Sequence, residues 1–286
     1  MSAALPVATP AWRHRLRPGF LSTRKGMFGF VVLVVLVSTA VFAPWIAPHS
    51  PEAIDGNRVL AGPNLAHLFG SDALGRDVLS RVIFAFRVSL AVAVGSTLLA
   101  FVVGMPLGLL AGYHGGWVDS AIMRPIDMLL ALPALLLAVA LIAILGPGSV
   151  IALLAIAVIY IPILARVARS STLVVASLTY VEGSRARGSG SLRILARHVL
   201  PNAVGPVIVQ ATILMGFALQ IEAALSFLGL GAQPPTPSLG VMLADGRDVL
   251  TQAPWVEIFP GLAIAVTVIA FNFFGDGLRQ RLDRGA

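Results

Sequence analysis

Six apolar stretches, each long enough to cross a lipid bilayer, determine what this 286-residue chain can fold into. A membrane-spanning helix needs about 20 mainly apolar residues to cross about 30 Å of hydrocarbon. The predicted spans are residues 28–48, 88–111, 122–145, 149–169, 203–228 and 256–275. Residues such as Gly104, Pro106, Pro133 and Pro162 are tolerated there, because a membrane bundle satisfies the backbone groups that they free. The sequence therefore predicts an all-α membrane protein with six transmembrane helices.

The composition of the chain also fits a lipid environment. Hydrophobic residues make up 57% of the sequence and charged residues only 12%, whereas soluble domains carry about 25% charged residues. The formal net charge of +7 does not indicate nucleic-acid binding, because the basic residues lie between the apolar stretches, as topology signals do. The absence of cysteine excludes disulfide bonds, thiolate metal sites and a cysteine nucleophile.

The positions of the basic residues predict the orientation of the chain, since short cytoplasmic loops are enriched in Lys and Arg. With a cytoplasmic N-terminus, fifteen of the twenty basic residues fall on the cytoplasmic side. These are Arg13, Arg15, Arg17, Arg24, Lys25, Arg124, Arg166, Arg169, Arg185, Arg187, Arg193, Arg197, Arg279, Arg281 and Arg284. The five on the outer side are Arg58, Arg76, Arg81, Arg87 and Arg247. We therefore expect both termini to be cytoplasmic.

This orientation divides the chain into segments on alternate sides of the membrane. The predicted segments are a cytoplasmic tail (1–27), a first span (28–48), an extracytoplasmic segment (49–87), a transmembrane domain (88–275) with a cytoplasmic loop (170–202), and a C-terminal cytoplasmic tail (276–286).

The basic N-terminus followed by an apolar stretch also resembles a signal peptide. The apolar stretch is longer than the usual 7–15 residues. The only small-residue cleavage pattern, Val41-Phe42-Ala43, is followed by Pro44, which disfavours cleavage. We expect this segment to be retained as a membrane anchor.

The end of the first outer segment is amphipathic. Val78, Val82 and Phe86 recur every four residues, which predicts a short helix lying along the membrane surface. Asp72 or Asp77 is expected to cap the start of this helix.

The cytoplasmic loop combines small residues with arginines. It contains Tyr180-Val181-Glu182-Gly183-Ser184-Arg185-Ala186-Arg187-Gly188 and later reaches Leu200-Pro201. The small residues would let another surface approach the backbone closely, while the arginines offer charged contacts around it. An arginine-rich loop by itself is usually only a topology signal, so a docking function depends on the order of these residues.

This loop resembles the signature loop of binding-protein-dependent importer permeases, which opens with Glu-Ala-Ala, has a Gly a few residues later and closes on Leu-Pro. Four positions match, namely Glu182, Gly188, Leu200 and Pro201. Gly183 and Ser184 replace the two Ala of the family pattern, so the positions stay small although helix propensity is lower.

Three further segments resemble the C-type subunit of dipeptide/oligopeptide permeases. Residues 69–81 match the segment before the second span, and residues 272–279 match the C-terminal end. Residues 228–238 match the late outer loop, although Leu239 stands where that loop commonly has Trp. The resemblance covers roughly residues 25–282.

The resemblance implies a type I ABC importer permease in a bacterial cytoplasmic membrane, with a coupling helix seated in a groove of an ATPase subunit. The implied partners are a second permease subunit, two ATP-binding subunits and an extracytoplasmic substrate-binding protein. ATP binding would draw the two coupling helices together and turn the cavity outward to receive a peptide. The implied coupling residues are Tyr180, Glu182, Gly183, Ser184, Arg185, Ala186, Arg187, Gly188, Leu200 and Pro201.

No ATP site is expected in this chain itself. A P-loop requires Gly-x-x-x-x-Gly-Lys-Ser/Thr, and the only lysine, Lys25, lacks the upstream glycines. We therefore expect no catalytic residue and no cofactor in this chain, with ATP and Mg²⁺ bound by the partner subunits.

Polar residues within the spans are candidates for the translocation path, because such residues are rare in membranes and often functional. Glu222 either lines the path or reaches polar neighbours in the bundle. Gln220 lies about 200° around the same helix, so the two cannot face one cavity. Asn272 contacts either the path or a neighbouring helix. Arg124 and Asp127, three residues apart, predict a structural ion pair.

The histidines fall outside the predicted spans. They are His14, His49, His67, His114 and His198. No pair has the i, i+4 spacing of a helical zinc site, so no metal site is predicted. An intramembrane serine protease is excluded as well, because it needs a Ser and a His within adjacent spans.

Other functions remain open beside the peptide importer. A stand-alone secondary transporter often has two halves with matching broken helices, and no internal repeat is visible in this sequence. A membrane scaffold would tolerate changes along the later spans. Permeases that resemble this chain also carry nickel or other small solutes, since the binding protein largely selects the substrate.

Overall fold

The computed structural model describes residues 24–283, which form helices joined by loops and one isolated β-bridge between Ser71 and Asp77. The helices are α1 (Arg24–Val41), α2 (Ala43–Ile46), the 3₁₀ turn η2 (Gly56–Arg58), α3 (Val78–His114), α4 (Gly116–Leu130), α5 (Ala134–Leu145), α6 (Ser149–Ala176), α7 (Thr179–Ala186), α8 (Ser191–Ile194), the π-helical turn η3 (Leu195–Val199), α9 (Leu200–Phe227), α10 (Leu239–Arg247) and α11 (Trp255–Asp283). Within these residues five helices are long and apolar enough to span a membrane, or six if the bent pair α4 and α5 forms one span.

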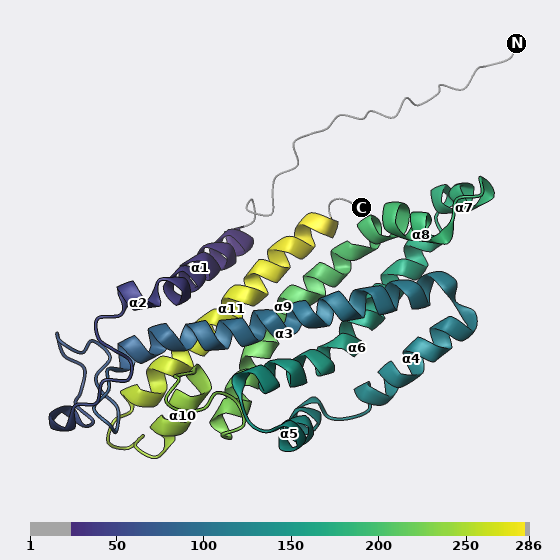
Figure 1. The fold of residues 1–286 in the computed structure, drawn as a ribbon. Coiled ribbons are helices and arrows are strands. Elements are labelled where there is room, and N and C mark those ends of the chain that lie inside the picture. The colour runs from purple at the N-terminus through teal and green to yellow at the C-terminus, as the bar shows by residue number, and fades with distance from the viewer. Residues whose placement is uncertain (1–23, 284–286) are drawn as a thin grey trace, which may run out of the picture.

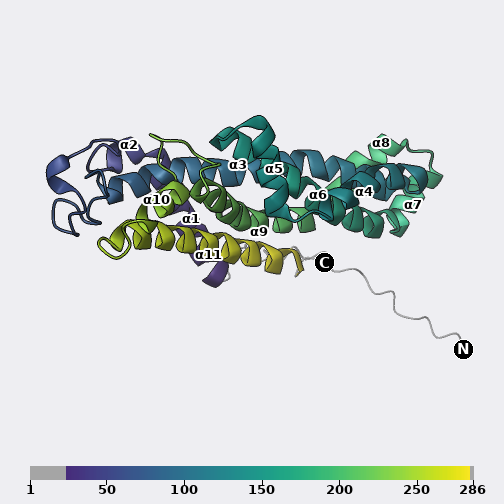
Figure 2. The same ribbon diagram turned by 90° about the horizontal axis from the view of Figure 1, so that it is seen from below.

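The long helices form one elongated bundle. Figure 1 shows α3 running along the bundle, and α3 packs against both α6 and α9. Helix α1 lies beside α11. In both views α7 and α8 lie at one end of the bundle, while α10 and the loops before α3 lie at the other (Figures 1 and 2). We call these the α7 end and the α10 end. The α7 end carries the loop that was predicted to be cytoplasmic.

Helices α3 and α6 approach closely through a row of glycines. Gly104, Gly108 and Gly112 recur every four residues on the face of α3 that meets α6. A Cβ atom at Gly108 would lie 2.2 Å from the carbonyl oxygen of Ala165 and 2.6 Å from the Cβ of Ala168. Small residues allow this approach, which membrane bundles use to gain van der Waals contact between helices.

Gly108→Ala is therefore expected to destabilise the protein by about 1–3 kcal/mol, because overpacking forces the α3 and α6 backbones apart. The measurement is the melting temperature of the purified full-length protein in detergent. Gly261→Ala in α11 is the matched control, since a Cβ there would meet only Leu243 Cδ2 at 3.8 Å. Equal melting temperatures for both variants would contradict close backbone packing at Gly108.

The structure differs from the sequence prediction at the start of α3. Residues 78–87 do not form a separate surface helix, because α3 continues without a break from Val78 to His114. Val78, Val82 and Phe86 are buried against α1, α10 and α11 rather than in a membrane surface. Their spacing therefore indicated a face buried within the protein. The predicted cap is confirmed at Asp77, whose side chain accepts a hydrogen bond from the Ser80 N–H.

A second difference lies in the predicted span 122–145. The structure breaks this segment into α4 and α5, which are bent by 92° relative to each other. Pro133 is the residue before α5, where proline disfavours a helical conformation in the preceding residue. Pro106 and Pro162, by contrast, lie inside the continuous helices α3 and α6. The presence of a proline in the sequence therefore did not show whether a helix would break there or continue through it.

Candidate functional site

The segment between α6 and α9 forms a compact turn of short helices at the α7 end (Figure 1). Helix α7 carries Glu182 in its first turn and Arg185 in its last, an arrangement that favours the helix dipole. It ends in a Schellman motif, with Gly188 N–H donating to Arg185 O at 2.9 Å and Ser189 N–H donating to Ser184 O at 3.2 Å. Gly188 has φ +77°, a left-handed conformation that glycine adopts without steric cost.

Helix α7 has a buried face and an exposed face. Val181 and Ser184 are buried, and Val181 joins the core cluster that also contains residues of η3 and α9. The predicted coupling residues Tyr180, Glu182, Arg185, Ala186, Arg187, Gly188 and Pro201 are exposed, and Gly183 and Leu200 are partly buried. The structure thus leaves most of the predicted coupling residues accessible at the α7 end and turns Ser184 inward.

Aromatic contacts hold α7 against its neighbours. The guanidinium of Arg185 lies over the ring of Tyr113, 4.6 Å from its centroid, and Arg185 Nε donates to the Tyr113 hydroxyl at 3.4 Å. Tyr113 belongs to the last turn of α3. The rings of Tyr180 and His198 meet edge to face, with their centroids 6.2 Å apart. The first contact connects α7 to the end of α3, and the second connects α7 to η3.

Two ion pairs fasten α4 to α6 near the same end. Arg169 donates two hydrogen bonds to the carboxylate of Asp119, at 2.5 and 2.6 Å. Arg166 donates to Asp127 at 2.6 Å. The predicted pair between Arg124 and Asp127 is wrong, because the packing of α6 beside α4 places the Arg166 guanidinium on this carboxylate instead.

The three candidates for the translocation path lie in different environments. Glu222 is 1% exposed and its Oε1 accepts a hydrogen bond from Ser226 Oγ at 2.7 Å. Gln220 is exposed, as expected for the opposite face of α9. Asn272 is partly buried next to Gly216 of α9, where a Cβ would lie 3.6 Å from Asn272 Oδ1. A role for any of them in the path stays a prediction.

The α10 end contains a buried ion network that sequence reasoning missed. Asp72, 1% exposed, accepts from Arg81 and, at 2.7 Å, from Arg76 Nε. Both arginines also reach Asp245 Oδ2 in α10, at 3.2–3.3 Å. Because Asp245 is more than 160 residues from these arginines in the sequence, no local spacing indicated the pairing.

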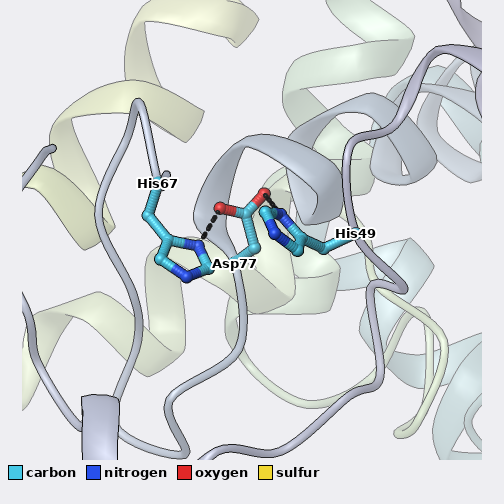
Figure 3. Close-up of side chains that lie close together, drawn as sticks. All are labelled: His49, His67 and Asp77. Carbon is cyan, nitrogen blue, oxygen red and sulfur yellow. Dashed lines mark hydrogen bonds and ion pairs between the residues drawn. The ribbon is translucent and has the colours of Figure 1, made fainter. Parts of the chain in front are cut away.

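A second group at the α10 end consists of His49, His67 and Asp77 (Figure 3). Their ligand atoms lie within 4.8 Å of one another. The sequence did not indicate this group, because its members are brought together by loops and do not share a helical face. The motif at residues 69–81 was the only local signal near it.

Comparisons with known proteins place this geometry in context. A family model described as the inner membrane component of binding-protein-dependent transport systems matches residues 104–286. A second, the N-terminal transmembrane domain of oligopeptide transport permease C, matches residues 11–63.

Curated relatives match nearly the whole chain. The glutathione transport system permease protein GsiD of Pectobacterium atrosepticum is 43% identical, over 99% of this chain and 96% of the relative. The dipeptide transport system permease protein DppC of Alkalihalophilus pseudofirmus is 40% identical, over 96% and 90%. The di/tripeptide transport system permease protein DppC of Pseudomonas aeruginosa is 43% identical, over 92% and 89%.

Solved structures share the fold. A chain of the MetNI methionine ABC transporter in an inward-facing conformation superposes with a TM-score of 0.59, at 21% identity, over 70% of this chain and 96% of that one. A chain of an amino acid ABC transporter, solved with histidines, gives a TM-score of 0.55 at 14% identity, over 72% and 94%.

Proposed function

The chain belongs to the family of binding-protein-dependent transport system inner membrane components, and from this premise we propose that it forms half of a translocation path for di- or oligopeptides. The predicted identity as a multi-pass permease subunit of an ABC importer in the bacterial inner membrane is confirmed by the family and by the relatives. The chain is a transport subunit, as its relatives are. These findings favour this function over a stand-alone secondary transporter.

The proposed substrate class is supported by the names of the relatives. Three relatives at 40–43% identity are named for glutathione, dipeptides and di/tripeptides. All three extend over at least 92% of this chain, so the match includes most of the transmembrane region. A permease for nickel or another small solute is the competing assignment, and substrate uptake distinguishes the two.

Membership of this family implies an ATPase partner and a substrate-binding protein. We propose a complex of two permease chains and two ATP-binding subunits, served by one extracytoplasmic binding protein. ATP and Mg²⁺ would be bound by the partner subunits, because the single lysine of this chain does not lie in a P-loop.

The exposed face of α7 is the observation that supports coupling to the ATPase. It presents a glycine-terminated helix with Glu182, Arg185 and Arg187 exposed on it, while Val181 anchors the helix in the core. A displacement of α7 would act on α3 through the contact between Arg185 and Tyr113. The Asp119–Arg169 pair would then carry the displacement to α4 and α6.

Arg185→Ala is expected to weaken coupling by about two- to fivefold, because an exposed cation–π contact contributes about 0.5–1 kcal/mol. The measurement is the number of ATP molecules hydrolysed per peptide imported, in proteoliposomes containing the complete complex. Arg193→Ala is the matched control, since it removes an exposed arginine of the same loop. If both variants hydrolysed the same number of ATP molecules per peptide imported, Arg185 would have no specific role in coupling.

Purification of the tagged chain from native membranes in mild detergent, followed by mass spectrometry, tests the proposed complex. Recovery of a second six-span protein together with P-loop ATPases supports the proposal, and ATP-dependent peptide uptake by the reconstituted complex supports the substrate class. Recovery of the chain alone, with uptake driven by an ion gradient, would contradict the proposed complex. Uptake of nickel without peptide uptake would contradict the substrate class only.

A further inference from the structure

His49, His67 and Asp77 come from three separate segments at the α10 end. His49 follows α2, His67 lies in the loop before α3, and Asp77 is the N-cap of α3. Figure 3 shows the Asp77 carboxylate beside the two imidazole rings, with one oxygen toward each ring. The two rings are stacked on each other, with their centroids 4.6 Å apart. His67 Nδ1 lies 2.7 Å from Asp77 Oδ1, and His49 Nδ1 lies 3.9 Å from Asp77 Oδ2.

The two distances have different meanings. At 2.7 Å, His67 Nδ1–H donates an ordinary hydrogen bond to the carboxylate. At 3.9 Å, His49 and Asp77 are too far apart to share a proton. Two metal–ligand bonds of about 2.1 Å that meet at a tetrahedral angle place their ligand atoms about 3.4 Å apart. The three ligand atoms lie within 4.8 Å of one another. Because the two rings are stacked, their side chains must rotate to direct all three ligand atoms at one ion.

Hydrogen bonds already position the backbone of the two histidines and the side chain of Asp77. The His49 N–H donates to Ser80 Oγ at 3.1 Å, in the first turn of α3. The His67 N–H donates to Asn64 Oδ1 at 2.9 Å. Asp77 Oδ2 accepts from the Ser80 N–H at 2.8 Å. Such outer contacts orient metal ligands in proteins. Because the His49 side chain is 39% exposed while the other two are buried, an ion would enter from the His49 side.

We propose that His49 Nδ1, His67 Nδ1 and the Asp77 carboxylate form a binding site for a divalent ion of the zinc class, with a fourth position open to solvent. Two imidazoles and one carboxylate match the ligands of zinc sites that keep an open position. Imidazole nitrogen favours Zn²⁺, Co²⁺ and Ni²⁺ over Mg²⁺ and Ca²⁺, which prefer oxygen ligands. The ion would join the segment after α2 and the loop at His67 to the start of α3.

Arg58 competes with the ion for His67. Its guanidinium contacts His67 Nε2, which must then act as the acceptor while Nδ1 carries the proton. A metal on Nδ1 places the remaining proton on Nε2, where it would face the Arg58 donor. Arg58 also pairs with Asp55 at 3.2 Å, and its side chain is 48% exposed. The guanidinium can therefore turn toward Asp55 and into solvent when the ion binds.

The test uses the full-length chain, purified with its accompanying subunits through a tag without histidine and stripped of metal by a chelator. Zn²⁺ and Co²⁺ are titrated, bound metal is counted by mass spectrometry, and tetrahedral Co²⁺ is followed by its visible absorption. We expect the wild-type chain to bind one more Zn²⁺ than the His49→Gln chain. The Zn²⁺ affinity of His49→Gln should fall by more than about 100-fold, which exceeds the usual effect of losing a residue that only hydrogen-bonds to a ligand.

Two further variants make the test specific. His114→Gln removes a histidine of the last turn of α3, at the α7 end, and is expected to bind Zn²⁺ as the wild type does. Arg58→Gln is expected to bind Zn²⁺ about tenfold more tightly, because a like charge beside the ion is removed.

Zn²⁺ is also expected to raise the melting temperature of the wild type and not that of His49→Gln. Equal Zn²⁺ affinity in the wild type and His49→Gln, or no binding by the wild type, would overturn the proposal and leave the group as a metal-free hydrogen-bonded contact. An unchanged affinity in Arg58→Gln would contradict the competition between Arg58 and the ion for His67.

Discussion

Asp72→Ala is expected to lower the free energy of unfolding by about 3–5 kcal/mol, because it leaves a buried guanidinium without its main partner. Asp72 and Arg81 are 1% and 2% exposed. Among the residues that the structure describes, the partly exposed Asp245 is the one carboxylate that would remain to pair with Arg81. The variant also removes the carboxylate oxygen that accepts from the backbone N–H groups of Leu74 and Arg76, both at 2.9 Å. The turn that leads into α3 would therefore loosen.

The melting temperature of the full-length protein in detergent measures this effect. Asp248→Ala is the matched control, because Asp248 pairs with Arg247 at the same end but its side chain is 72% exposed. An exposed pair contributes at most about 1 kcal/mol, so the control should melt close to the wild type. If Asp72→Ala and Asp248→Ala lowered the melting temperature equally, burial would not explain how much the Asp72 network stabilises the protein.

Gly188→Trp is expected to reduce peptide transport to background while the protein still folds. Apart from Gly188 and its two neighbours in sequence, no atom of residues 24–283 lies within 4 Å of a Cβ built at Gly188, so this part of the chain has room for a side chain there. A bulky side chain would instead occupy the space that the proposed ATPase groove needs. Transport and peptide-stimulated ATP hydrolysis by the reconstituted complex measure the loss, and the melting temperature checks the fold.

Gly188→Ala separates bulk from backbone strain. The left-handed conformation, with φ +77°, costs any residue with a Cβ about 1–2 kcal/mol, so Ala and Trp share this cost. If an ATPase subunit docks beside Gly188, the Gly188→Ala variant should retain most of the transport that the Gly188→Trp variant loses. An equal loss of transport in both variants would attribute the loss to backbone strain at the end of α7. Full transport by the Gly188→Trp variant would contradict docking at this position.

The segment proposed for coupling was identified from the sequence, but only part of its geometry could be predicted. Gly188 marked the end of the first short helix, since a glycine just after a helix favours a left-handed cap. The sequence did not reveal that Val181 and Ser184 face the core, or that Arg185 reaches Tyr113, 72 residues away. A helix of eight residues has too few turns for its apolar spacing to define a buried face.

The amphipathic pattern of residues 78–87 shows a similar limit. An apolar stripe indicates that a helix buries one face, and it does not indicate what covers that face. In the structure α1, α10 and α11 cover Val78, Val82 and Phe86, so the segment continues α3. A membrane surface would have produced the same spacing.

Some features of this protein were determined by its sequence alone. Long apolar stretches must form helices in lipid, because no water is available to satisfy their backbone groups. The helical membrane fold therefore followed from local residues, as did the position of the segment between α6 and α9 that is proposed for coupling. Tertiary structure decided the bend between α4 and α5, the pairing of Asp127 with Arg166, the network around Asp72 and the meeting of His49, His67 and Asp77. These contacts join residues far apart in the chain, and which of several competing partners each side chain meets depends on how the helices pack.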